Sequence, residues 1–199
     1  MKKILVGALV GGLIIFIWQF LSFAAINFHE PAQQYTEKEQ AILDFFKSQN
    51  LEEGGYVIPG VPPGANKEEY ESKMKTAVGQ PWASIQYHDS WEDNMIMNMI
   101  RGFVVNVIVV YFFCWFVRRM NAPSFSNIFT GALVTGLIIF LNAPYVNHIW
   151  YDSFDIWAFL MDYVVSWGLV GLWLGWYLTR NSREPNKVRA DERKIEMAP

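Results

Sequence analysis

The sequence has little cysteine and little charge. Its single cysteine, Cys114, lies within an apolar run, which excludes an intramolecular disulfide and any CxxC metal or redox motif. Charged residues make up only 18% of the 199 residues, and the formal net charge is −3. The sequence contains no basic patch interleaved with aromatic residues, so nothing in it indicates a nucleic-acid partner. It also lacks a Gly-rich phosphate loop, a GxSxG elbow and an HExxH motif.

Long hydrophobic runs are what the sequence has in abundance. Hydrophobic residues make up 52% of the chain and aromatic residues 17%, a composition typical of membrane proteins. A membrane helix needs about 20 mostly apolar residues. The sequence therefore predicts an all-α integral membrane protein, a four-transmembrane-helix bundle with a small α(+β) extracytoplasmic insert. The four predicted spans are residues 4–26, 100–117, 126–146 and 157–178.

The first span has some features of a secretory signal peptide. It follows Lys2 and Lys3 and ends near a small-x-small pattern, Ser22-Phe23-Ala24. Its apolar run is longer than the 7–15 residues that are usual in signal peptides. We therefore expect an uncleaved membrane anchor, with the lipid bilayer as its surroundings.

The basic residues predict the orientation of the spans. Lys2 and Lys3 precede the first span, Arg118 and Arg119 follow the second, and six Lys and Arg between 180 and 194 follow the fourth. With four spans these groups fall on one side, and Lys and Arg are enriched in cytoplasmic loops. We expect both termini in the cytoplasm. The pattern resembles that of bacterial four-span envelope proteins. This resemblance implies a location in the cytoplasmic (inner) membrane and indicates no particular function.

This topology divides the chain into four regions. Residues 1–26 are the first transmembrane helix, and residues 27–98 form an extracytoplasmic, periplasmic insert. Residues 99–178 contain the other three transmembrane helices, and residues 179–199 form a charged cytoplasmic tail.

The insert at residues 27–98 is acidic and has few large apolar residues. It contains twelve Asp and Glu against five Lys, a formal charge of −7. Asn66 and Glu69 have the spacing of a capping box and predict a helix start. The alternating stretch 82–88 predicts a strand that pairs with residues 56–58. A segment of this size with so few apolar groups makes a marginal core, so we expect it to contact the spans or a partner.

The three histidines are predicted to lie on one side of the membrane, each near carboxylates. Neutral imidazole combined with carboxylate suits metals such as Zn or Cu. No two of these histidines have the i, i+4 spacing of a helical metal motif. A shared metal site and ordinary hydrogen-bonding roles at the membrane interface therefore both stay open, and no other cofactor is indicated. The candidate metal ligands are His29, His88, His148, Glu30, Asp89 and Asp152.

Two ionisable residues, Arg101 and Asp162, lie inside the predicted spans, near their outer ends. Such residues are costly in a bilayer and are usually paired. We predict an Arg101–Asp162 ion pair that holds the second span against the fourth. The alternative is a proton or anion pathway, or a pocket that opens outwards.

The stretch GALVGGLIIFI at 7–17 returns as GALVTGLIIFL at 131–141, with nine of eleven positions identical. Both copies lie in spans that enter from the cytoplasm, so an internal duplication stays open. Small residues four positions apart allow helix backbones to approach closely in lipid. We expect close helix packing, and a homo-oligomer is a further option. The packing residues predicted in this way are Gly7, Gly11, Gly131, Thr135, Gly171 and Gly175.

Three functions are compatible with these features. The leading hypothesis is a non-enzymatic accessory, scaffold or partner-binding subunit, whose acidic extracytoplasmic face contacts a membrane or periplasmic protein. The second is a metal-binding protein or enzyme that uses the His and carboxylate cluster at the outer membrane interface. The third is a small transporter with the Arg and Asp pair in its pocket.

Overall fold

The computed structural model describes residues 2–121 and 123–180, which form two compact units. Residues Tyr35–Asp93 make up one unit, called here the insert unit, and the other described residues make up the second, called the helical unit. The insert unit is shorter than the predicted insert at 27–98. Most of the predicted charged tail, residues 181–199, lies outside the described residues.

The helical unit contains four helices that are long and apolar enough to cross a membrane. The prediction of a mostly helical chain with four such helices and a small sheet is confirmed, and 69% of the structure is helical. The first long helix is α1 (Lys2–Phe20), continued by the π-helical turn η1 (Leu21–Ala25). The others are α4 (Met95–Val117); α5 (Phe125–Phe140) with η3 (Leu141–Tyr145) and α6 (Val146–Trp150); and α7 (Ile156–Thr179).

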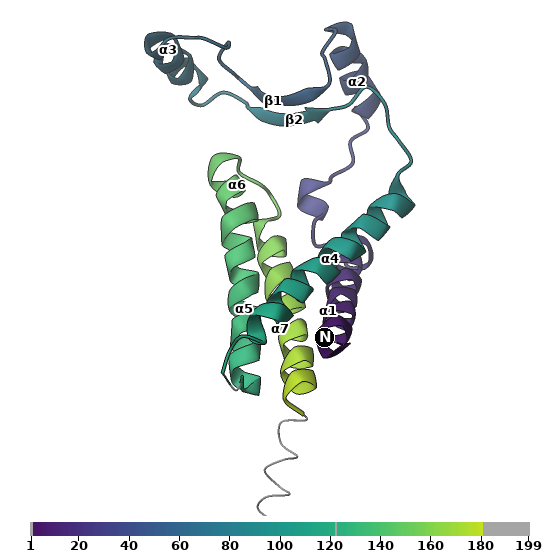
Figure 1. Cartoon of the computed structure of the whole chain (residues 1–199). Helices are drawn as coiled ribbons and strands as arrows, with labels where there is room; N and C mark the ends of the chain where they lie inside the picture. Colours follow the sequence, from purple (N-terminus) through teal and green to yellow (C-terminus); the bar gives the residue numbers. More distant parts are fainter. Residues whose placement is uncertain (1, 122, 181–199) are drawn as a thin grey trace, which may run out of the picture. The chain divides into compact units, whose positions relative to one another are not determined.

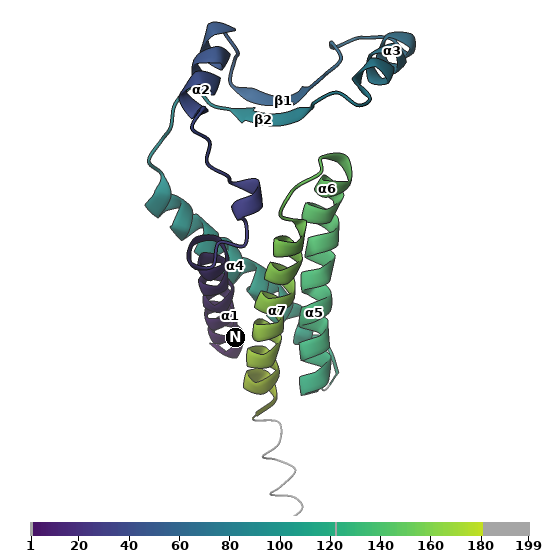
Figure 2. The ribbon, with the colours of Figure 1, turned by 180° about the vertical axis from the view of Figure 1, so that it is seen from behind.

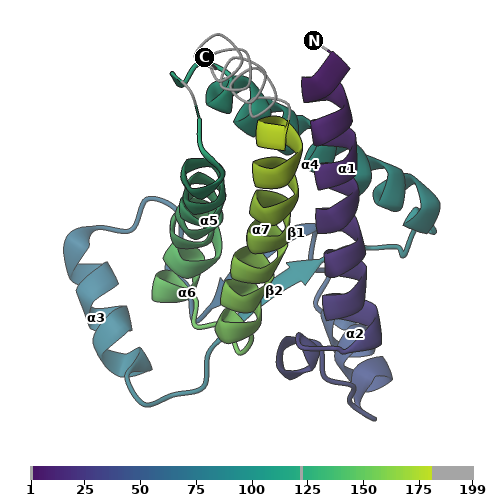
Figure 3. The ribbon, with the colours of Figure 1, turned by 90° about the horizontal axis from the view of Figure 1, so that it is seen from below.

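Helix α7 lies between α5 and α1, and α4 packs against α1 and crosses the other helices obliquely (Figures 1, 2 and 3). Where the helices face water, burial of apolar side chains stabilises this arrangement by about 25 cal/mol per Å² of apolar surface removed from water. Where lipid surrounds the helices, the hydrophobic effect does not act between them, and van der Waals packing stabilises their contacts. The buried core collects side chains from all four helices, among them Ile15, Val110, Phe113, Ile128, Trp167 and Leu174.

Small residues let α1 and α4 approach each other closely. A Cβ atom at Gly11 would lie 2.7 Å from Cγ1 of Val110, and one at Gly12 would lie 2.8 Å from the backbone of Val107. A Cβ at Gly7 would meet Leu174 of α7 at 3.0 Å. Gly7 and Gly11 therefore lie at helix contacts, together with Gly12, which the spacing argument does not select.

Close approach of α5 and α7 depends on a different glycine from the predicted one. A Cβ at Gly136 would lie 2.7 Å from the carbonyl oxygen of Tyr163, whereas one at Gly131 would lie 3.7 Å from the nearest atom, in Phe113. Thr135 donates its hydroxyl hydrogen to the carbonyl of Gly131 within its own helix. On α7, Cβ atoms at Gly171 and Gly175 would lie 2.9 Å from Ala132 and 2.7 Å from Phe125, respectively.

The chain reverses at the end of α1. Asn27 has φ of 58°, the left-handed conformation that often ends a helix and that Asn tolerates better than most residues. The amide of Phe28 donates back to the carbonyl of Ser22 at 2.9 Å. This reversal turns the following residues, up to the 3₁₀ turn η2 (Glu30–Ala32), back toward the helices of the same unit.

The insert unit contains α2 (Glu39–Ser48), β1 (Gly54–Ile58), α3 (Lys67–Ala77) and β2 (Ala83–Tyr87). The predicted strand pairing is confirmed: β1 and β2 are antiparallel, with Tyr56 opposite Ile85. The predicted capping box is also present, because Asn66 and Glu69 exchange hydrogen bonds of 2.9 and 3.1 Å at the start of α3.

The core of the insert unit is small. Tyr87 is its one buried residue, and it packs edge-on against Phe46 of α2. Burial raises the pKa of the Tyr87 phenol above 10.0, and the nearby carboxylates of Asp89 and Glu53 raise it further. This small core is the marginal core expected for an insert with few large apolar side chains.

Candidate functional site

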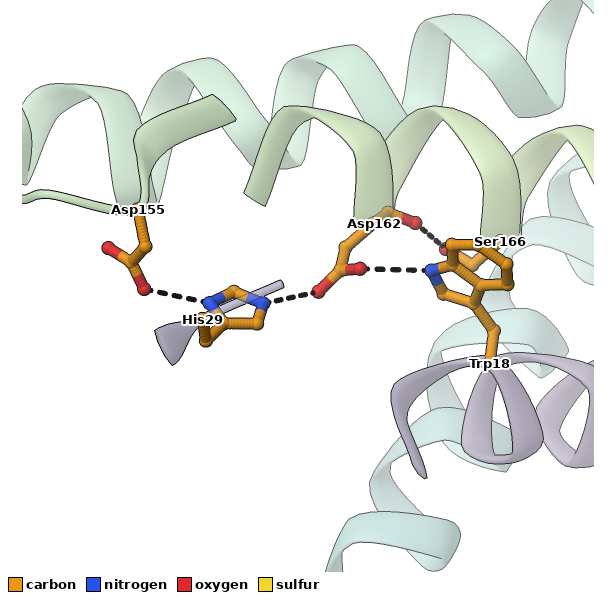
Figure 4. A network of polar contacts seen from close by, with 5 residues as sticks. All are labelled: Trp18, His29, Asp155, Asp162 and Ser166. Carbon is orange, nitrogen blue, oxygen red and sulfur yellow. Dashed lines mark hydrogen bonds and ion pairs between the residues drawn. The ribbon is translucent and has the colours of Figure 1, made fainter. Parts of the chain in front are cut away.

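The most unusual group in the helical unit is a buried histidine between two carboxylates. His29 is fully buried, with 0% exposure. Its Nδ1 lies 2.7 Å from Oδ2 of Asp155, and its Nε2 lies 3.0 Å from Oδ2 of Asp162. Figure 4 shows the imidazole bridging the two side chains along α7. We call His29, Asp155, Asp162 and Trp18 the His29 cluster.

Helix geometry places the two carboxylates on one face. Asp155 is the N-cap residue of α7, and Asp162 follows it by seven positions. Seven residues are close to two helical turns, about 10.5 Å along the axis, which leaves space for an imidazole ring between the two side chains. The Asp155 side chain makes no cap hydrogen bond to its own helix and contacts His29 instead.

Two aromatic rings cover the imidazole. The ring of Phe23, in η1, lies parallel to that of His29, with centroids 3.7 Å apart and an interplanar angle of 7°. Phe159, one turn after Asp155, packs edge-on against the imidazole, with centroids 4.8 Å apart. These rings exclude water from His29, so its contacts with the carboxylates lie in surroundings of low polarity, where they are stronger than in water.

Helix α1 also contributes to the cluster. Nε1 of Trp18, in α1, donates a hydrogen bond to Oδ1 of Asp162 at 3.0 Å. The hydroxyl of Ser166 donates to the backbone carbonyl of Asp162, as Figure 4 also shows. Both oxygens of Asp162 are therefore in contact with hydrogen-bond donors or with His29, and the cluster connects α1, the segment after it and α7.

The charge of the cluster follows from the number of protons in its two short contacts. Each contact between a ring nitrogen and a carboxylate is a hydrogen bond only if a proton lies between the two atoms. When both contacts are hydrogen bonds, they hold two protons, carried either by an imidazolium between two carboxylates or by a neutral imidazole beside one protonated carboxyl. In both cases the net charge of the cluster is −1.

The predicted partner of Asp162 is not the observed one. Within residues 2–121 and 123–180, Asp162 has an ion-pair contact with His29 and none with Arg101. Arg101 is exposed on α4. The two residues have compatible depths along their helices, but depth does not determine the direction in which each side chain points around its helix axis.

The other two histidines lie in separate surroundings. His148, in α6, has its Nδ1 3.1 Å from Oδ1 of Asp152, and the same nitrogen accepts a hydrogen bond from the amide of Ser153 at 3.0 Å. A nitrogen that accepts from an amide carries no proton of its own, so the Asp152 contact contributes little attraction. This arrangement ends the short helix and does not involve His29.

His88 belongs to the insert unit and is exposed. Its Nδ1 lies 3.9 Å from Oε1 of Glu53, and the same oxygen accepts a hydrogen bond from the amide of Asp89 at 2.9 Å. Glu30 is exposed in the first turn of η2. In the described part of the chain, no group of three or more His, Cys, Asp or Glu side chains has an arrangement that could hold a metal ion.

Two members of the His29 cluster, His29 and Asp162, are among the residues predicted from the sequence, but with other partners. Asp155 is not predicted as a partner of His29, and Trp18 is not predicted. The sequence contains one indication of this pairing, because Asp155 and Asp162 lie seven positions apart at the start and in the second turn of an apolar segment. That spacing places Asp155 and Asp162 on one face, and a buried face with two carboxylates requires a polar partner.

The chain was compared with protein-family models, with curated proteins and with solved structures, and none of the three comparisons found a match.

Proposed function

We propose that this chain is a multi-pass protein of the bacterial cytoplasmic membrane that displays its acidic insert unit to a protein partner. In this proposal the four long helices span the bilayer and both termini lie in the cytoplasm, because the basic residues gather at one end of the helices. The insert unit then lies on the extracytoplasmic side. The chain acts as an accessory or scaffold subunit, and the helices anchor it.

The observation that carries this proposal is the composition of the insert unit's surface. The unit buries Tyr87 and leaves large apolar side chains in solvent, with Trp91 97% and Val78 81% exposed. The predicted insert also has a formal charge of −7. Exposed Trp and Tyr are enriched where proteins bind other proteins, and a strong charge steers a partner of opposite charge. We infer a basic partner with an apolar recess.

The His29 cluster supports the anchoring part of the proposal. His29 precedes Tyr35, the first residue of the insert unit, by six positions. By bonding to Asp155 and Asp162, it fastens the chain that leaves α1 to the start of α7. The exit point of the insert from the helical unit is therefore held by buried polar contacts rather than by a free loop.

Site-specific photo-crosslinking in native membranes tests the proposal. A photoreactive phenylalanine analogue replaces Trp91, and the matched control places it at Lys67, another highly exposed residue, at the start of α3. We expect one discrete adduct from position 91 that weakens as salt rises, because screening reduces charge attraction. We expect no adduct of that mass from position 67.

Two results would contradict the proposal. Identical adduct patterns from both positions would indicate random collision. An adduct from position 91 with twice the mass of the chain would assign this surface to contacts between copies of the chain rather than to a separate partner.

A further inference from the structure

A cavity of about 340 Å³ lies among α1, α4, α5 and α7, beside the His29 cluster. Its volume falls in the range of small-ligand sites, which begins at about 300 Å³. Asp162 forms part of its wall, and this side chain is more than nine-tenths buried. We propose that this cavity binds an organic cation, a primary ammonium group carried on a compact apolar body.

The charge of the surroundings points to a cation. The His29 cluster carries a net charge of −1 when its two hydrogen bonds are formed, and none of the described residues that line the cavity is Lys or Arg. An uncompensated charge is costly away from water. A cation in the cavity next to Asp162 removes this cost, whereas an anion or a neutral apolar molecule does not.

The walls suit the body of such a ligand. Phe23, Phe159, Tyr163 and Trp167 all line the cavity. Aromatic faces attract ammonium groups through their ring quadrupoles and pack against apolar groups. The carboxylate thus contacts the ammonium group of the ligand, and the aromatic rings contact its apolar body.

Three hydrogen-bond acceptors favour a primary ammonium over a quaternary one. Each oxygen of Asp162 is used once, by Trp18 or by His29, and an ionised carboxylate has about four lone-pair sites. Asn106 donates to Gln19 at 2.7 Å, which leaves the Asn106 carbonyl oxygen as an acceptor. The Ser166 hydroxyl donates to its own helix and keeps its lone pairs. A primary ammonium has three N–H donors for these three groups.

The binding test uses 2-phenylethylammonium and its neutral analogue 2-phenylethanol, titrated calorimetrically into the full chain in an uncharged detergent. We expect the cation to bind at least about tenfold more tightly than the alcohol, the ratio for one charge-assisted hydrogen bond. Asp162→Asn keeps the shape of the side chain and removes its charge, so the preference for the cation should disappear. Asp152→Asn, at an exposed carboxylate away from the cavity, should retain it.

A second pair of variants avoids the buried cluster. Val105 lines the cavity and is 55% exposed, so Val105→Trp fills the site from the surface of α4. Its neighbour Val104, 46% exposed, does not line the cavity. We expect Val105→Trp to weaken cation binding by about tenfold or more, and Val104→Trp to leave it within about twofold.

The ammonium group can belong to a free amine or to a lipid headgroup, and lipid composition separates the two. In nanodiscs of phosphatidylethanolamine, which carries a primary ammonium, competition with the probe identifies a headgroup as the occupant. Equal probe affinity in phosphatidylethanolamine and phosphatidylcholine discs identifies a free amine. Three results would each overturn the proposal. They are equal binding of the amine and the alcohol, equal effects of the two Val variants on binding, and no binding of the amine in detergent or in either kind of disc.

Discussion

Replacing His29 by Ala removes the imidazole that lies between two buried carboxylates and contacts both of them. Asp155 and Asp162 are both more than nine-tenths buried, and each is in ion-pair contact with His29. Removing one partner of a buried ion pair typically costs about 3–5 kcal/mol. We expect His29→Ala to lower the free energy of unfolding by about this amount at pH 7, and the hydrogen bond from Trp18 to keep the loss from being larger.

Equilibrium unfolding in mixed detergent micelles, followed by tryptophan fluorescence, measures this free energy of unfolding. His88→Ala is the control, because His88 is exposed in the insert unit, and we expect it to change stability by less than about 0.5 kcal/mol. The reasoning is refuted if His29→Ala costs no more than His88→Ala at pH 7.

Two further predictions concern helix packing and topology. Gly136→Ala should destabilise the α5–α7 contact by about 1–3 kcal/mol, because its Cβ would lie 2.7 Å from the carbonyl oxygen of Tyr163. The control is Gly102→Ala, whose Cβ would have nothing within 4 Å and which should be neutral or stabilise α4 by up to about 1 kcal/mol. Equal thermal midpoints for the two variants would contradict this assignment. A cysteine placed at Ser90 should react with a membrane-impermeant maleimide in intact cells and one at Met120 only after permeabilisation, whereas the reverse labelling would overturn the proposed orientation.

The long helices could be predicted because hydropathy accumulates over many residues. A window of about 20 apolar residues identifies a long apolar helix whatever packs against it, so the ends of α7 agree with the predicted span to within a residue or two. The second long helix begins at Met95, five residues before the predicted span at 100–117. Its first turn contains one polar residue, Asn98, which does not stop a helix but lowers the local hydropathy.

Glycine spacing predicted helix contacts only in part. Gly7 and Gly11 lie at close approaches, whereas Gly131 does not. Gly12 and Gly136 occupy the same place in the two copies of the repeat, and both lie at close approaches, although the four-residue spacing selects neither. Gly12 meets α4 and Gly136 meets α7, so the two copies pack through the same position, whereas the tertiary structure decides which helix each copy meets.

The sequence by itself determined the kinds of element and their order: four long apolar helices, an acidic insert with a two-stranded sheet, and a capping box at Asn66. These features depend on composition and on contacts a few residues apart. Only the tertiary structure decided the partner of Asp162. His29 and Asp155 are separated by 126 positions, and they meet because the chain reverses at Asn27 and because two aspartates share one face of α7. Such a contact is selected by the packing of whole helices, which fixes rotation about each helix axis, and no local pattern specifies that rotation.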